Sequence, residues 1–136
     1  TNGYFQFDSS QAPLNEAANE EYADGVVVDS GNIYISGLRE ITNDSIILKL
    51  QESNGVIVDA MSGIPFKNRD GASFIRGNYI YIAGYNLPNE YYGWAKINKN
   101  DLTYDAGYGT GGYHIHNNNP GGRPNSLYVN SEGEDQ

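Results

Sequence analysis

The chain has 136 residues, 38 % of them hydrophobic, and its 17 acidic and 8 basic residues give a formal net charge of −9 at pH 7. This length and composition predict one domain with an apolar core of modest size. The negative charge is repelled by phosphate backbones and anionic lipid headgroups, which argues against nucleic acid and membrane surfaces as partners. No apolar run is long enough to cross a bilayer. The absence of cysteine excludes disulfides, thiolate zinc sites and cysteine nucleophiles.

The N-terminal part of the chain is acidic and carries little secondary-structure signal. The chain begins at Thr1 rather than Met and shows no secretory signal, which suggests a processed or partial product. Residues Pro13–Tyr22 hold a weak 3.6-residue apolar period. An acidic loop is favoured there over one or two helical turns, because isolated helices this short are marginal.

The rest of the chain alternates short β-branched or aromatic runs with turns rich in Asn and Gly. Those two residues adopt positive φ at low cost, which two-residue hairpin turns require. The pattern predicts an antiparallel all-β meander. Its expected strands are Val26–Asp29, Ile33–Gly37, Ser45–Leu50, Val56–Asp59, Ala72–Ile75, Tyr79–Gly84, Gly93–Ile97 and Leu102–Asp105.

The strands repeat with a period of 46 or 47 residues. Ile33–Gly37 returns as Ile80–Gly84, and Lys49 returns as Lys96 between similar neighbours. Four strands per unit of this length is typical of a propeller blade. We therefore expect an all-β fold, namely a β-propeller fragment built of four-stranded antiparallel blades. Its expected units are the last strand of a preceding blade with an acidic connecting loop (1–23), two blades (24–69 and 70–121) and the first strand of a following blade (122–136).

Two blades do not close a ring, because propellers need roughly four to eight. An open pair of blades would leave sheet faces uncovered and sheet edges unpaired. The expected partners are therefore the remaining blades of the same protein, or other copies of this chain.

Three segments of the second unit resemble the delta-60 repeat of bacterial extracellular β-propellers. Ile80–Tyr85 resembles its second strand, Ala95–Asn98 its third strand, and Asp105–Gly112 its closing motif, with Tyr108 in the aromatic position. The first unit lacks the aromatic residue and the glycine-rich tail after Asp59, and is more similar to the related SBBP-type repeats. The resemblance implies a secreted or cell-surface scaffold and brings no catalytic residues.

The glycine-rich segment of the second unit formally satisfies G-x-G-x-x-G, the dinucleotide-binding pattern. Such a site needs a helix that starts at the last glycine, and the residues from Tyr113 onwards do not form one. We therefore interpret the glycines as a turn that connects blades. Asp59 and Asp105, at the same point of the two units, are expected to accept hydrogen bonds from backbone N–H groups of the turns. These structural-turn residues are Asp59, Asp105, Gly107, Gly109, Gly111 and Gly112.

Signals for metal binding and catalysis are weak. His114 and His116 would share one face of an extended strand, within reach of one Zn²⁺ or Cu²⁺. The neighbouring Asn117–Asn119 are poor ligands for such metals, so two polar loop histidines are favoured over a metal site. Calcium is the alternative cofactor, although no D-x-D-x-D-G loop is present. Without a nucleophile elbow or a catalytic triad, no enzyme activity and no cofactor are expected.

Tyr91, Tyr92 and Trp94 are the candidates for a binding surface. They cluster at the entry of an expected third strand, and Tyr or Trp beside Asn is typical of lectins and protein-binding faces. Packing between blades is the competing interpretation. The leading functional hypothesis is a non-catalytic extracellular or cell-surface propeller scaffold that binds a protein or a surface. The alternatives are a carbohydrate-binding, lectin-like propeller, and part of a larger propeller enzyme whose active residues lie outside this chain.

Overall fold

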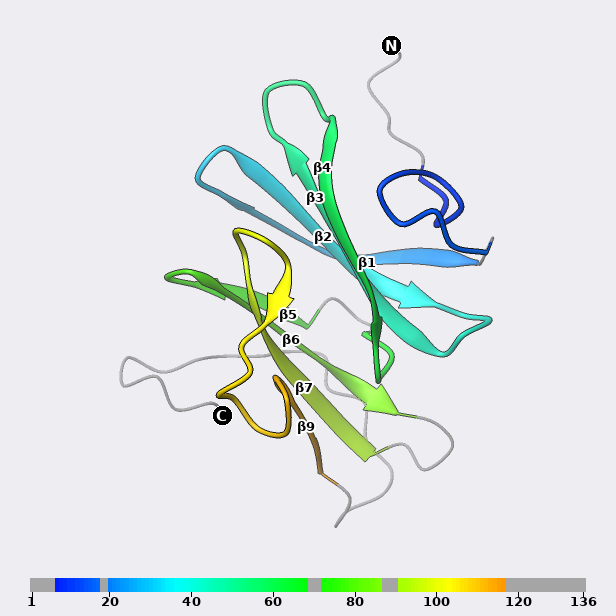
Figure 1. The fold of residues 1–136 in the computed structure, drawn as a ribbon, viewed down its shortest axis with the longest axis vertical. Coiled ribbons are helices and arrows are strands. Elements are labelled where there is room, and N and C mark those ends of the chain that lie inside the picture. Colours follow the sequence, from blue (N-terminus) through cyan, green and yellow to red (C-terminus); the bar gives the residue numbers. More distant parts are fainter. Residues whose placement is uncertain (1–6, 18–19, 69–71, 87–90, 117–136) are drawn as a thin grey trace.

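The computed structural model describes residues 7–17, 20–68, 72–86 and 91–116. Within them the chain forms two open antiparallel β-sheets, and their inner faces share one hydrophobic core (Figure 1). These residues contain no helix, and so none that is long and apolar enough to cross a membrane. The predictions of an all-β class and of antiparallel sheets are confirmed.

The first sheet has four strands in chain order, and the second has five. In the second sheet the order is β5-β6-β7-β8, and β9 pairs with β7 as well. The strands of the first sheet are β1 (Glu21–Asp29), β2 (Asn32–Arg39), β3 (Asp44–Gln51) and β4 (Ile57–Ile64). Those of the second are β5 (Ser73–Arg76), β6 (Tyr79–Asn86), β7 (Tyr91–Asn98), β8 (Thr103–Tyr104) and β9 (Tyr113–His116).

Each of the eight expected strands coincides with one of β1 to β8. β1 begins at Glu21 and not at Val26, where the sequence predicts its start. The pair Asp24–Gly25 is typical of a turn, but a β-bulge between Ala23 and Gly25 lets the strand continue through it. The segment expected as an acidic loop forms turns and no helix up to Ala17, and its last two residues belong to β1. The strand expected at the start of the chain, in the unit 1–23, lies outside the described residues as far as residue 6, and Phe7 and Asp8 belong to no strand. The strand expected in 122–136 lies outside the described residues.

The glycine-rich segment lies inside the second sheet, and the expectation that it connects blades is corrected. β8 pairs with β7 at Ile97 and Asn98, and β9 pairs with β7 from Tyr92 to Ala95. The loop 105–112 therefore interrupts the outer strand of one sheet, whereas β4 forms the corresponding strand of the first sheet in one piece with two register shifts. The physical reason is that β9 pairs with backbone groups of β7 that β8 is too short to reach.

The two sheets are built alike, with equivalent residues 47 positions apart. The backbone N–H of Glu52 donates to the carbonyl of Gly31 at 3.0 Å, and the N–H of Lys99 donates to the carbonyl of Asn78 at 2.9 Å. These two bonds close equivalent corners of the two sheets. The internal repeat of the sequence thus corresponds to a repeat of hydrogen bonds and not only of residue types.

Glycine is required at one equivalent position of both sheets, at Gly37 in β2 and Gly84 in β6. A Cβ atom at Gly37 would lie 1.8 Å from the carbonyl oxygen of Tyr22. A Cβ atom at Gly84 would lie 2.0 Å from the carbonyl oxygen of Lys67. A neighbouring backbone therefore occupies the space of a side chain at both positions, which accounts for the repeated glycine.

The main hydrophobic core lies between the two sheets. Phe66, in the segment that connects the sheets, is fully buried against the inner face of β7, where a Cβ atom at Gly93 would lie 2.6 Å from its ring. Each fully buried aliphatic or aromatic side chain of this kind contributes about 1.5–3 kcal/mol. The buried members of the core are Tyr34, Ile47, Ile64, Phe66, Ile80, Ile82, Ala95, Ile97 and Leu102.

Polar contacts connect the β7–β8 turn of the second sheet to the first sheet. The Tyr34 hydroxyl donates to the carbonyl of Lys99 at 3.2 Å, and the Lys49 ammonium donates to the carbonyl of Asn100 at 2.8 Å. The ammonium of Lys99 lies 2.5 Å from a carboxylate oxygen of Asp29. The hydrogen bond from Lys99 is the main reason that the pKa of Asp29 is lowered. These contacts fix how the two sheets lie against each other.

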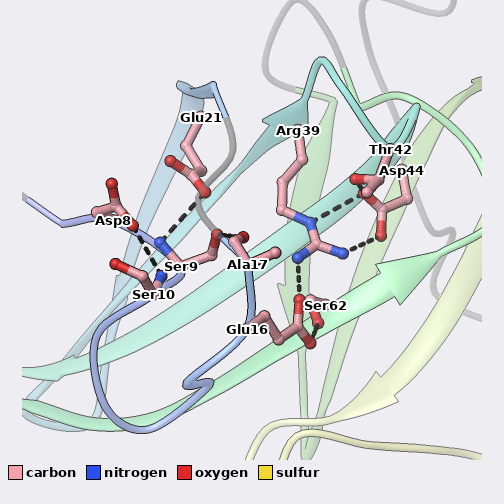
Figure 2. Close-up of polar contacts among 10 residues, drawn as sticks. All are labelled: Asp8, Ser9, Ser10, Glu16, Ala17, Glu21, Arg39, Thr42, Asp44 and Ser62. Atoms are coloured by element: carbon pink, nitrogen blue, oxygen red, sulfur yellow. Dashed lines mark hydrogen bonds and ion pairs between the residues drawn. The ribbon is translucent and has the colours of Figure 1, made fainter.

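The segment 7–17 covers part of the outer face of the first sheet. Phe7 and Leu14 pack against Ile46, Leu48 and Leu50. Figure 2 shows how the polar residues of this segment contact the sheet. The chain from Asp8 to Ala17 is held by hydrogen bonds that Ser9 makes to Glu21 and to Ala17.

Arg39 connects the same segment to the ends of β3 and β4 (Figure 2). Its guanidinium donates to both carboxylate oxygens of Asp44, at 2.9 and 2.5 Å, and also to Glu16. Ser62 donates to the other oxygen of Glu16 at 2.5 Å. The hydrogen bond from Ser62, followed by the one from Arg39, lowers the pKa of Glu16. The side chains of Arg39 and Asp44 are only 6 % and 10 % exposed. Water therefore cannot compensate the charge of Asp44 if Arg39 is removed, whereas Arg39 would keep its contact with Glu16 if Asp44 were removed.

Candidate functional site

The outer face of the second sheet carries a cluster of aromatic residues. Side chains alternate between the two faces of a strand, and Ile80, Ile82 and Ala95 occupy the inner face. The intervening residues of β6 and β7 therefore lie on the outer face, together with the loop residue Tyr108, which contacts them. We call this surface the aromatic face, and its members are Tyr79, Tyr81, Trp94, Lys96, Tyr108 and His114.

The rings of the aromatic face contact one another in sequence. Trp94 and His114 are stacked, with centroids 5.2 Å apart and planes at 24°. Tyr108 meets His114 edge to face at 5.3 Å and Tyr81 edge to face at 6.4 Å. Such offset and edge-to-face pairs are worth about 0.5–1.5 kcal/mol each beyond their buried area. The contacts hold the loop 105–112 against the sheet.

Lys96 is the positive charge at the centre of the aromatic face. Its ammonium lies 2.8 Å from Asp105 and 4.1 Å from the ring centroid of Tyr79. Burial is the largest single effect and disfavours the charge, but the hydrogen bond to Asp105 and the charge interactions with Tyr81, Asp105 and Tyr79 together outweigh it, so the pKa of Lys96 is raised. The same bond lowers the pKa of Asp105. Both groups are therefore ionised at neutral pH, which suits a cation–π and ion-pair contact and is unsuited to a lysine nucleophile or base.

The three aromatic candidates of the sequence lie on β7 itself, not in a loop that precedes it. Tyr92 and Trp94 share the outer face, where they pair with His116 and His114 of β9. Tyr91 alternates with Tyr92 and lies on the opposite side of the strand. The sequence therefore identified residues of one face but added a neighbour that points away from it.

The two histidines are exposed and lie on the outer face of β9, as expected for an extended segment. His114 stacks on Trp94. Within the described residues no group of three or more His, Asp or Glu side chains is placed to hold a metal ion. The absence of a metal or calcium site stays a prediction.

The predicted turn residues have separate roles. Asp105 accepts a hydrogen bond from the backbone N–H of Gly107 at 3.2 Å, as expected of a turn residue. The expectation for Asp59 is corrected: it lies inside β4, where it pairs with Lys49, and it accepts a hydrogen bond from the N–H of the next strand residue, Ala60, at 2.9 Å. Three of the loop glycines have positive φ, and the segment is followed by strand β9 rather than by a helix, so it is no dinucleotide site. Those three glycines are Gly109 (55°), Gly111 (68°) and Gly112 (101°).

Sequence reasoning missed the contacts of Lys96 and Tyr108. Lys49 and Lys96 are equivalent, and each lies near a tyrosine ring, Tyr34 at 5.9 Å for Lys49 and Tyr79 at 4.1 Å for Lys96. The lysine repeated inside an apolar strand was the available signal. Its partner Tyr108 was recognisable only as part of a glycine-rich motif.

Comparison with known proteins gave no match, whether to a family model, to a curated protein or to a solved structure. The function is therefore argued from the geometry of the chain.

Proposed function

We propose that this chain is part of a non-catalytic β-propeller scaffold, secreted or at a cell surface, and that it binds a protein partner through the aromatic face. The proposal rests on one observation: the face with which the first sheet packs against the second has an equivalent face on the second sheet. Tyr34 and Lys49 lie on the face with which the first sheet packs against the second. Tyr81 and Lys96 lie at the equivalent positions of the aromatic face. A surface that packs against a sheet in one unit is suited to pack against a sheet in the next.

The composition of the aromatic face supports protein binding. Tyr and Trp give large, rigid contact areas and are enriched where protein interfaces gain most of their affinity. The ion pair with Asp105 already satisfies the charge of Lys96, so covering the face leaves no unpaired ammonium. Tyr92 and Trp94 are half-buried in the chain itself, which leaves part of each ring for a partner.

Acrylamide quenching of Trp94, the single tryptophan of the chain, tests the proposal. We expect weaker quenching in the intact protein isolated from its source than in the 136-residue chain diluted until it is monomeric, because a partner covers the aromatic face in the intact protein. A Trp94→Phe variant of the intact protein provides the control for any other tryptophan. Equal quenching in the two preparations would contradict a covered face.

Carbohydrate recognition is the second candidate, favoured by the stack of Trp94 on an exposed histidine. A half-buried indole offers a flat surface to a sugar ring, and the imidazole beside it offers hydrogen bonds. A glycan array separates the two candidates. Binding that disappears in Trp94→Ala would support a lectin, whereas no binding together with weak quenching in the intact protein would support the scaffold.

A further inference from the structure

The outer face of the first sheet is apolar and partly uncovered. Val26 and Val28 of β1 are 66 % and 56 % exposed, beside Ile35 and Ile33, with which they pair. The residue equivalent to Val28 in the second sheet is Ile75, which packs against the core between the sheets. The first sheet thus exposes a surface that its counterpart buries.

The uncovered part of this face lies at one end of the sheet. The segment 7–17 covers the other end, where Glu16 contacts Arg39. A groove of about 160 Å³ separates Phe7 of that segment from β1, β2 and β3. The valines lie toward the β1–β2 turn, which is the end that carries the polar contacts between the sheets inside the chain.

Charged residues at the β1–β2 turn end of the sheet indicate which partner would cover the two valines. Inside the chain, Lys99 of the second sheet pairs with Asp29 of the first at 2.5 Å. The residue equivalent to Lys99 is Glu52, as the matching hydrogen bonds of the two corners show. The residue equivalent to Asp29 is Arg76, since each ends the first strand of its sheet. The signs of both charges are exchanged, so the charges beside the two outer faces complement each other. On the aromatic face the loop 105–112 already packs over Tyr81, which is 7 % exposed, so a second copy would contact the remaining part of that face.

We propose that copies of this chain associate head to tail, with the outer face of the first sheet of one copy on the aromatic face of another and Glu52 paired with Arg76 between them. The proposal rests on the proposed function and names its partner as a second copy. The arrangement repeats the packing of the two sheets inside the chain. Arg76 also has an interaction within its own chain, and the new pair adds to it. A head-to-tail contact closes into a ring if the rotation permits and otherwise extends into a filament.

Sedimentation velocity of the 136-residue chain over a wide concentration range tests the association. We expect reversible self-association that weakens about tenfold in Glu52→Lys and about tenfold in Arg76→Glu, because each change replaces attraction by repulsion. Glu20→Lys makes the same charge change at the other end of the first sheet and is expected to leave association unchanged. Thermal melts of all variants establish that they remain folded.

Mixing the two variants gives the decisive observation. In a mixture of Glu52→Lys and Arg76→Glu chains, two kinds of mixed contact form. One pairs the introduced lysine with the introduced glutamate, and the other pairs the original Glu52 with the original Arg76, so both pair opposite charges. We expect the mixture to associate like the parent, although each variant alone associates about tenfold more weakly. If Arg76→Glu lowers the melting temperature, Arg76→Gln is used in its place. The pairing is then supported if Arg76→Gln and Glu52→Lys each weaken the association and Glu20→Lys does not.

Three outcomes would overturn the inference: a monomer at every concentration, association insensitive to both charge changes, or a mixture that does not associate. A monomeric chain together with a protected Trp94 in the intact protein would refute the second copy as partner and leave the proposed function standing. Equal Trp94 quenching would refute the proposed function itself. The two failures are therefore distinguishable.

Discussion

Replacing either of the two equivalent glycines by alanine tests whether the sheets share one backbone construction. A Cβ atom at Gly37 would lie 1.8 Å from a carbonyl oxygen, and one at Gly84 would lie 2.0 Å from a carbonyl oxygen. Ordinary C···O contacts are about 3.3–3.6 Å, so the backbone of β1 or of the Lys67 segment has to move by more than 1 Å, as the difference of these distances shows. Neither carbonyl belongs to a flexible side chain.

The magnitude follows from two opposing contributions. Alanine in a strand interior gains about 0.5–1 kcal/mol over glycine in conformational entropy. Overpacking costs about 1–3 kcal/mol, and each backbone hydrogen bond lost when the strands separate costs about 1 kcal/mol more. The bonds at risk include the pair between Lys67 and Tyr85, at 2.8 and 3.1 Å. We expect Gly37→Ala and Gly84→Ala each to lower the free energy of unfolding by about 2–3 kcal/mol.

Urea denaturation followed by circular dichroism measures this loss. The midpoint is expected to fall in both variants while the slope with denaturant stays constant, since a changed slope would indicate a different unfolded or native state. Gly107→Ala is the matched control, because its φ is not in the positive range and its Cβ would lie 3.5 Å from Asp105, an ordinary contact. Parental stability in either Gly37→Ala or Gly84→Ala would refute the reasoning.

Three further predictions concern charges and metal. Arg39→Met should cost about 3–5 kcal/mol in urea denaturation, because it leaves the carboxylate of Asp44 buried without its partner, and adding Asp44→Asn should recover part of the loss. Hydrogen bonds from Ser62 and Arg39 hold the pKa of Glu16 below its ordinary value. Its stabilising contribution is therefore present above the ordinary pKa and is lost as the pH falls through the lowered pKa, so thermal melts of Glu16→Gln should depend less on pH in this acidic range than those of the parent chain. Zinc in excess should leave the melting temperature unchanged, whereas a saturable rise that His116→Ala abolishes would show a metal site at His114 and His116.

The strands were predictable because their determinants are local. β-branched and aromatic runs between Asn-Gly turns locate β1 to β8, and the period of 47 residues relates the two sheets before any contact is known. The sequence allowed an extended segment at His114 and His116, but the place of β9 in the sheet was not predictable in this way. Tyr113–His116 follows a glycine-rich loop and gains its strand conformation from pairing with the beginning of β7, a contact that no local pattern indicates.

The candidate site was predictable only in parts for the same reason. The sequence identifies His114 and Trp94 separately, one as a possible ligand and one as a possible binding residue, because they are 20 positions apart. β7–β9 pairing brings them into one stack. The Lys99–Asp29 pair spans 70 positions. Glu52 is equivalent to Lys99 and Arg76 is equivalent to Asp29, each with the opposite charge, and this relation is recognised only when the two sheets are compared residue by residue.

Two of the three positive-φ glycines that precede β9, Gly109 and Gly111, allow the cost of backbone strain to be measured separately from the cost of a steric clash. Gly109 and Gly111 have φ of 55° and 68°, so alanine at either position costs about 1–2 kcal/mol for the left-handed conformation. A Cβ at Gly111 meets nothing within 4 Å, whereas a Cβ at Gly109 would lie 2.4 Å from the Tyr113 carbonyl and 2.7 Å from the His114 ring. Gly109→Ala should therefore cost about 2 kcal/mol more than Gly111→Ala. Because His114 stacks on Trp94, only Gly109→Ala should also shift the tryptophan emission of the folded chain. Equal losses of stability with unchanged emission in both variants would mean that the loop does not lie against the aromatic face.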